Sequence, residues 1–177
     1  MQGLQNNIIK LRALESEDLD FLFKVENNPS FWEVSSTQTP FSKYTLSKYL
    51  ENSHQDIYEA KQLRLVIVSS LDDKIIGFID LFDFNPQHHR AGIGILILEK
   101  YQNKGFAKET LKLFIDYVFK HLNLYQIYAN IGTDNNYSIQ LFEKLSFQKI
   151  GIKKDWILSN GEFKDVVLYQ LININYK

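Results

Sequence analysis

The sequence contains no cysteine. This absence excludes disulfide bonds, a thiolate nucleophile and metal sites built on cysteine. Neither sign of charge is in excess, because 20 Lys and Arg residues stand against 21 Asp and Glu residues, for a net charge of −1. Such a chain has no long-range field that would attract nucleic acid or an anionic bilayer. We therefore expect partners that are neither nucleic acids nor membranes, and we expect no metal site.

Long apolar runs are missing as well. No stretch of about eighteen apolar residues occurs, and residues 1–7 lack the basic and apolar segments of a signal peptide. We expect a cytoplasmic protein. Internal repeats, linkers and low-complexity segments are also absent from the sequence, and 177 residues suffice for one hydrophobic core. The sequence therefore predicts a single domain over residues 1–177.

The spacing of apolar residues predicts strands and helices in mixed order. Strands are expected over residues 8–14, 63–69, 75–84, 91–98 and 126–131, followed by a hairpin of 148–158 and 163–174 that turns at Asn160-Gly161. Helices are expected after an N-cap at Ser16, over 41–53, from Gly105 to about residue 121, and over 137–145. A polar connection over 30–40 joins the first two helices, which we expect to form a lid. The order predicts an α/β or α+β fold, a mixed sheet with helices on its faces.

The segment Gln102-Asn103-Lys104-Gly105-Phe106-Ala107 lies between a predicted strand and an amphipathic helix. Unpaired N–H groups at a helix N-terminus and the helix dipole favour a diphosphate, and Gly105 removes the Cβ that would block close approach. The segment is not a Walker A loop, because its lysine precedes its glycine. Taken alone, it is equally compatible with an ordinary crossover helix.

Gly92 and Gly94 lie inside a predicted strand, with Ile97 in place of the third glycine of a dinucleotide fingerprint. That motif is therefore excluded. Glycine inside a strand usually marks either close approach of a ligand or backbone, or a crowded crossing in the core. The sequence leaves both interpretations open.

The loop in this setting resembles the Q/R-x-x-G-x-G/A loop of the GNAT superfamily of N-acetyltransferases, which holds the pyrophosphate of acetyl-CoA. The similarity covers about Ile8 to Leu171 and is most specific from Arg90 to Phe147. Residues 88–91, 101–102, 122–125 and 157–161 look most like bacterial spermidine N-acetyltransferases, and ribosomal-protein N-terminal acetyltransferases are also similar. The resemblance implies a mainly antiparallel twisted sheet flanked by helices, with a cofactor cleft between splayed strands. It also implies acetyl-CoA as co-substrate.

The resemblance implies three places of contact with acetyl-CoA. The 102–107 loop would hold the pyrophosphate, the strand over 91–98 would offer backbone groups to the pantetheine arm and thioester, and Asn135 would contact the same arm. Asn135 also suits a plain helix N-cap, a role compatible with the first. The cofactor-binding residues expected on this basis are Gly94, Ile95, Leu96, Leu98, Gln102, Asn103, Lys104, Gly105, Phe106, Ala107, Asn135 and Phe142.

Two catalytic positions depart from the family pattern. The general acid of the family is a tyrosine at the position that here reads Phe142. Tyr137 is five residues away, about 140° around the helix, and cannot simply replace it. The glutamate that serves many relatives as general base is replaced by Gly92. The candidates for the base are Asp80, Asp83, His88, His89 and water, and among them we assign Asp83.

The acceptor implied by the resemblance is a primary amine, either a small amine or a polyamine. Glu26, Glu33 and Asp80 are the expected contacts, although the segment Val34–Pro40 lacks the acidic residues of the spermidine enzymes. Protein N-terminal or aminoglycoside acetylation and a catalytically weak acyl-CoA-binding sensor remain alternatives. A homo-oligomer is compatible with the same resemblance.

Overall fold

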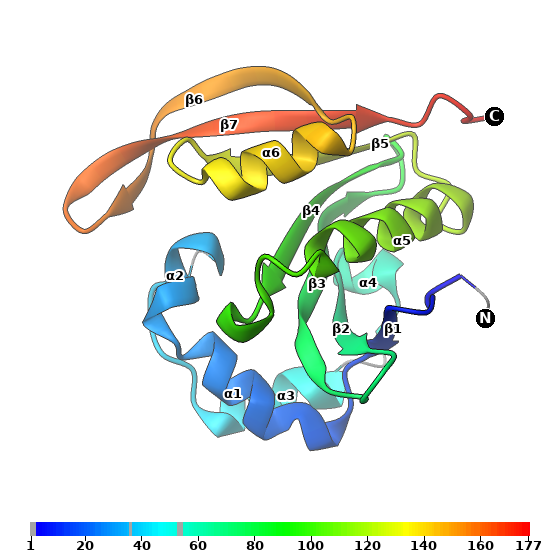
Figure 1. Ribbon diagram of the computed structural model, residues 1–177. Coiled ribbons are helices and arrows are strands. Elements are labelled where there is room, and N and C mark those ends of the chain that lie inside the picture. Colours follow the sequence, from blue (N-terminus) through cyan, green and yellow to red (C-terminus); the bar gives the residue numbers. More distant parts are fainter. Residues whose placement is uncertain (1–2, 36, 53–54) are drawn as a thin grey trace.

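A computed structural model of the protein describes residues 3–35, 37–52 and 55–177. Its centre is a seven-stranded sheet in the order β1-β2-β3-β4-β5-β7-β6 (Figure 1). The strands are β1 (Ile9–Ala13), β2 (Leu63–Ser69), β3 (Ile75–Asn85), β4 (Arg90–Ile97), β5 (Gln126–Gly132), β6 (Gln148–Ser159) and β7 (Glu162–Ile172). Only β4 and β5 pair in parallel in the described sheet. The predicted mixed, mainly antiparallel sheet is confirmed.

Six α-helices accompany the sheet in the described residues. They are α1 (Leu19–Glu26), α2 (Pro29–Ser35), α3 (Lys43–Glu51), α4 (Ile57–Ala60), α5 (Phe106–Lys120) and α6 (Asn136–Lys144). None of them is both long and apolar enough to cross a membrane. Ser36 of the predicted polar connection and Ser53 at the predicted end of a helix lie outside the described residues.

Two predictions about the first helices are wrong. Ser16 does not cap α1, because it is the first residue of a 3-10 helix in which the Asp18 carboxylate accepts a bond of 2.9 Å from the Glu15 N–H. The predicted polar connection over 30–40 begins inside a helix, because α2 covers Pro29–Ser35. Proline suits the first helical position, where its fixed φ is already helical and its missing N–H is not needed.

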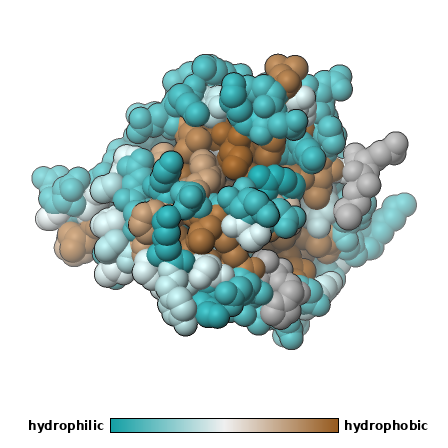
Figure 2. Space-filling view, turned by 90° about the horizontal axis from the view of Figure 1, so that it is seen from below, coloured by the Kyte–Doolittle hydropathy of each residue, from teal (hydrophilic) through white to brown (hydrophobic). Residues whose placement is uncertain are grey.

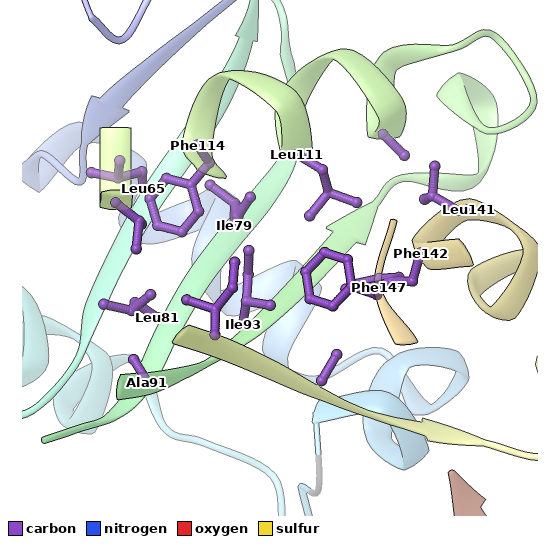
Figure 3. Close-up of a cluster of buried hydrophobic side chains, with 14 of the residues drawn as sticks. Leu65, Ile79, Leu81, Ala91, Ile93, Leu111, Phe114, Leu141, Phe142 and Phe147 are labelled. Atoms are coloured by element: carbon purple, nitrogen blue, oxygen red, sulfur yellow. The ribbon is translucent and has the colours of Figure 1, made fainter. Parts of the chain in front are cut away.

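The sheet has a hydrophobic core on each face. Alternate residues of β2 serve opposite faces: Leu65 and Ile67 belong to the core with α5 and α6, while Val66 and Val68 belong to the core with α1 and α3. Figure 3 shows the first core, in which Leu111 and Phe114 of α5 approach strand residues such as Ile79 and Ile93. In the second core, Leu22, Val25, Leu46 and Leu50 of α1 and α3 are buried. These two helices are therefore part of the packed fold, and the prediction of a lid is wrong.

The strands β4 and β5 pair only at their beginnings, where Arg90–Gly92 lies beside Gln126–Tyr128. Farther along, β4 stays with β3 to Ile97, and β5 stays with β7 to Gly132. The two halves of the sheet therefore part after Gly92. The predicted splay is present.

Gly92 is the last residue of β4 that pairs with β5, and it lies against the aromatic ring of Phe82. A Cβ on Gly92 would overlap the ring of Phe82, which packs edge-to-face on Tyr128 with ring centroids 5.8 Å apart. A Cβ on Gly94 would lie 3.8 Å from the same ring, an ordinary contact distance. Of the two interpretations of a glycine in this strand, the crowded crossing in the core therefore holds for Gly92 and not for Gly94.

We expect Gly92→Ala to lower the free energy of unfolding by about 1–3 kcal/mol, because the new methyl group overpacks against Phe82. The matched variant Gly94→Ala should be neutral or stabilising by up to about 1 kcal/mol, since it restricts the unfolded chain without a clash. Chemical denaturation measures both variants. Equal losses at the two positions would contradict the packing described here.

Candidate active site

A cavity of about 1020 Å³ opens where β4 and β5 part. Residues of α1, α2 and α3 line one side, β3 and β4 the base, and β5, α6 and the β6–β7 hairpin the other side. Figure 2, which views the molecule from below, shows apolar residues gathered in the middle of the surface between more polar ones. The cavity therefore takes residues from helices on both faces of the sheet, α1–α3 and α6, and from most of its strands, including β2.

The cavity brings together predicted residues that lie far apart in the sequence. Its lining includes the predicted cofactor residues Gly94, Ile95, Leu96, Asn135 and Phe142, and also the predicted acceptor residues Glu26, Glu33 and Asp80. Among the described residues, Leu98 and the 102–107 loop are not part of this lining. They follow β4 and lead into α5.

The backbone of β4 presents only some of its polar groups to the cavity. The Leu98 N–H donates to the Ile76 carbonyl at 2.9 Å, so it points toward β3. Backbone direction alternates along an antiparallel ladder, so Leu96 and Gly94 also bond toward β3, while the N–H and C=O of Ile95 face the free edge. The Ile97 carbonyl fits the same alternation, because it accepts a 3.0 Å bond from the Gln102 amide. Of the predicted strand residues, Ile95 has its backbone groups on the edge that parts from β5.

The predicted phosphate loop enters α5 through a left-handed glycine, and its last two residues, Phe106 and Ala107, belong to the helix. Gly105 has φ of 84° and is the N-cap of this 15-residue helix. A Cβ placed on it would meet no atom of the described structure within 4 Å beyond its chain neighbours. The first N–H groups of α5 have no carbonyl one turn earlier to bond to. Open space at a helix N-terminus fits the diphosphate of acetyl-CoA.

Asn135 caps α6. Its side-chain oxygen accepts a 3.1 Å hydrogen bond from the Ser138 N–H, so the predicted N-cap is confirmed. The amide nitrogen of Asn135 is a separate donor group. A contact with a cofactor therefore stays compatible with the cap.

Phe142 lies on α6 and lines the cavity. Its side chain is only 3% exposed, and its ring packs edge-to-face on Phe147 with centroids 4.9 Å apart (Figure 3). Phe142 therefore belongs to the core as well as to the cavity lining. Tyr137 is 48% exposed and is absent from the lining among the described residues. Its hydroxyl does not replace the one that Phe142 lacks.

The structure does not bring Asp83 into the cavity. A register shift interrupts the β3–β4 pairing between Phe82 and Asn85, and Asp83 has a left-handed φ of 50°. Its exposed carboxylate accepts a 2.9 Å bond from the Tyr128 hydroxyl. Burial and this bond raise the pKa of Tyr128 to about 12, so its hydroxyl stays protonated.

The two histidines lie at the β3–β4 turn, at the end of β4 opposite the splay. The Nδ1 atom of His89 is 3.2 Å from the Asn123 carbonyl, and the ring packs on Tyr176. His88 is exposed. Of the four side chains considered for the general base, the described cavity lining contains only Asp80.

Asp80 and Glu26 share one arginine in the cavity wall. Arg64 Nε lies 2.6 Å from Asp80 Oδ1, and the guanidinium also bonds to Glu26 and lies 5.3 Å from the ring centroid of Phe78. Burial by itself would lower the pKa of Arg64, but the charges of Asp80 and Glu26 raise it, so the guanidinium is permanently charged. Two carboxylates against one guanidinium leave a net charge of −1. Sequence reasoning missed Arg64, although it is a single charge in the apolar strand β2.

Glu33 has a cationic partner too. Its carboxylate oxygens both lie 3.0 Å from Lys164 Nζ, and the Ser159 hydroxyl also donates to it. These bonds from Ser159 and Lys164 lower the pKa of Glu33. Lys164 also lies 2.7 Å from Asp134, which lines the cavity. All three predicted acceptor residues therefore line the cavity, and each is already paired with a cation of the chain.

Residues 9–148 match the family described as the acetyltransferase (GNAT) domain. The spermidine N(1)-acetyltransferase of Vibrio cholerae is 30% identical over 174 residues, which are 97% of this chain and 96% of that protein. A crystal structure of spermidine N-acetyltransferase from Vibrio cholerae in complex with CoA and spermine resembles this chain with a TM-score of 0.87, at 29% identity and with 97% and 99% of the two chains covered. A dodecameric structure of the enzyme from the same organism has a TM-score of 0.80, at 30% identity and with 94% and 95% covered.

Proposed function

Given that this chain belongs to the GNAT acetyltransferase family, we propose that it transfers the acetyl group of acetyl-CoA to a primary amine of a small polyamine bound in the cavity between β4 and β5. One observation carries this proposal: the same cavity is lined by the free edge of β4 at Ile95 and by the carboxylates of Glu26 and Asp80. The free edge of β4 suits the thioester arm of the co-substrate, and the two carboxylates suit an ammonium group of the acceptor. The spermidine N-acetyltransferase of Vibrio cholerae, with which the chain aligns, acts on such an amine.

The chain's own residues would hold acetyl-CoA along the edge that β5 leaves. The N-terminus of α5 at Gly105 would bind the diphosphate, the backbone groups of Ile95 would align the pantetheine arm, and the Asn135 amide would donate to it. The bound co-substrate supplies an acetyl group activated as a thioester. Apolar rings, among them Phe82 and Phe142, line the cavity beside this edge.

The part of the cavity around Glu26 and Asp80, which we call its inner end, suits an alkyl chain with an ammonium group. Apolar and aromatic residues form much of the wall, namely Leu22, Phe31, Phe41, Tyr49, Phe78 and Phe82. Glu26 and Asp80 add the net negative charge that remains after their pairing with Arg64. We propose that these two carboxylates hold a charged amine of the acceptor next to the reacting one.

The reacting amine must lose a proton before it attacks. We propose that Asp80, which among the four side chains considered for the base is the one in the described cavity lining, binds the acceptor and does not take the proton. Arg64 stabilises its charged form through the bond from Nε. This arrangement suits binding of an ammonium group, so the proton of the reacting amine passes to solvent.

Release of the CoA thiol with a panel of amines tests this function. We expect one acetylated amine, identified by its mass, for each thiol released, with spermidine among the accepted amines. If the protein binds acetyl-CoA but releases no thiol with any amine, the result would favour the acyl-CoA sensor. The apolar ring of Phe142, at the family's proton-donor position, also favours that alternative. Acetylation confined to peptide N-termini or aminoglycosides would overturn the polyamine proposal alone.

Phe142→Tyr is expected to raise the turnover rate about tenfold where departure of the thiolate limits it, because an unoptimised acid is worth less than the 10² to 10⁴ of a positioned one. A thiol has a pKa about 1.5 units above neutral, so releasing a bare thiolate costs only about 2 kcal/mol, which is why the wild type can turn over. The gain should grow below neutral pH. Tyr137→Phe, which removes an exposed hydroxyl from the same helix, is the control and should leave the pH profile unchanged. An unchanged rate for Phe142→Tyr would mean that another group protonates the sulfur or that another step limits turnover.

We also propose that copies of this chain associate, as in the dodecameric Vibrio cholerae neighbour. The last two strands leave large apolar side chains exposed: Ile150, Ile152, Trp156, Leu158, Phe163 and Ile172. An exposed apolar edge strand is a typical surface for association. Light scattering should give a mass above that of one chain, and a monomer at micromolar concentration would contradict the proposal.

A further inference from the structure

Two lysines of the β6–β7 hairpin reach the rim of the cavity. Lys164 places its ammonium group between Glu33 of α2 and Asp134 before α6, at 3.0 Å from both oxygens of the first and 2.7 Å from the second. Both carboxylates line the cavity. This contact joins parts of the chain that are 131 and 30 residues apart. In Figure 1 the tip of the hairpin lies near α2.

The second lysine, Lys153, places its ammonium group over an aromatic ring. Lys153 Nζ lies 4.7 Å from the ring centroid of Trp156 and 2.8 Å from the Asn130 side-chain oxygen. Trp156 and Asn130 also line the cavity. Carboxylates, amide oxygens and aromatic faces are the groups that bind ammonium ions. The rim therefore has the chemistry of cation sites, and the chain's own ammonium groups occupy them.

The inner carboxylates can pair only part of the charge of a long polyamine. Glu26 and Asp80 share Arg64 and keep one net negative charge. Further ammonium groups of a long acceptor would extend toward the rim. There they meet Glu33 and Asp134, between which the Lys164 ammonium group already holds both carboxylate oxygens of Glu33 and one of Asp134.

We propose that Lys164 is a specificity-determining residue, whose ammonium group occupies an anionic subsite of Glu33 and Asp134 and thereby disfavours acceptors that bring a further positive charge to the rim. The inference rests on the proposed function. It predicts that the wild type prefers short amines with one or two charges over the tetra-amine spermine. The alternative is that Lys164 is only a structural latch between the hairpin and α2.

Lys164→Gln and Glu33→Gln distinguish these two roles, because both variants break the same contact but remove opposite charges. If Lys164 occupies the subsite, Lys164→Gln should lower the KM for spermine about tenfold, and Glu33→Gln should raise it. The KM for a short monoamine should change less than about twofold in both, since a monoamine brings no second charge to the rim. Lys154→Gln is the matched control, because Lys154 lies on the same hairpin but pairs with Asp165 at 2.6 Å and is 74% exposed. It should leave both KM values unchanged.

A shift of KM for spermine in the same direction in Lys164→Gln and Glu33→Gln would overturn the inference and show a structural latch. An unchanged preference in Lys164→Gln would also overturn it. Calorimetric titration of spermine into the same folded variants gives a readout that does not need turnover. If none of the variants acetylates any amine, the proposed function fails, while opposite shifts of the spermine Kd would still support the subsite.

Discussion

Gly105→Glu is expected to weaken acetyl-CoA binding at least about a hundredfold while the protein stays folded. The new carboxylate would stand at the N-terminus of α5, where we place the diphosphate, and like charges there repel. The space around Gly105 is open, so the side chain meets no steric clash. The left-handed φ of 84° adds a strain of about 1–2 kcal/mol, which a folded domain tolerates. Isothermal titration calorimetry with acetyl-CoA measures the effect.

Gly161→Glu is the matched control for this variant. Gly161 has φ of 83° in the β6–β7 turn, and a Cβ there would also meet no described atom within 4 Å. The control therefore carries the same strain and the same added charge far from the loop. We expect equal losses of stability in the two variants and a normal acetyl-CoA affinity in Gly161→Glu. Retained affinity in a folded Gly105→Glu variant would refute the placement of the diphosphate.

Arg64→Met is expected to lower the free energy of unfolding by about 2–4 kcal/mol, less than the loss of a fully buried partner, because these side chains are only partly buried. Glu26 and Asp80, whose side chains are only 11% and 27% exposed, would face each other without a cation. Methionine keeps much of the apolar length that packs on Phe78. Chemical denaturation at neutral pH gives the difference in stability.

Two further variants separate the lost charge from lost packing. Adding Glu26→Gln and Asp80→Asn to Arg64→Met removes all three charges and should recover most of the loss. Arg12→Met breaks a different bidentate pair, with Asp18 at 2.6 and 2.9 Å, and should destabilise the protein without changing the KM for an amine. A loss below about 1 kcal/mol in Arg64→Met, as for an exposed pair, would contradict the partly buried network described here.

Local patterns in the sequence were sufficient for most of the fold. The β2 and β3 strands, the hairpin turn at Asn160-Gly161 and the helix after Gly105 depend on apolar spacing and on glycine, which act over a few residues. The start of α2 was missed because Asn27-Asn28-Pro29 is typical of a helix end, and the buried faces of α1 and α3 were underestimated. The resemblance supplied the splay of β4 and β5, which no local pattern indicates.

The site could be predicted only in part, because its contacts are long-range. Asp80 lines the cavity, whereas Asp83 follows Phe82, where the β3–β4 register shifts, and binds the Tyr128 hydroxyl outside the described cavity lining. Arg64 binds Glu26 and Asp80, which are 38 and 16 residues away. No sequence pattern pairs such residues. For the same reason the pairing of Glu33 with Lys164 appears only in the folded chain.

The central claim is that the acyl donor and the amine meet where β4 and β5 part. Calorimetry with a conjugate of CoA joined through an acetyl-length linker to one primary amine of spermidine tests it most directly. Because the two ends are linked, we expect the conjugate to bind about a hundredfold more tightly than CoA. We expect both Gly105→Glu and Asp80→Asn to weaken it. A conjugate that binds no more tightly than CoA, or that is insensitive to Asp80→Asn in a folded variant, would contradict this account.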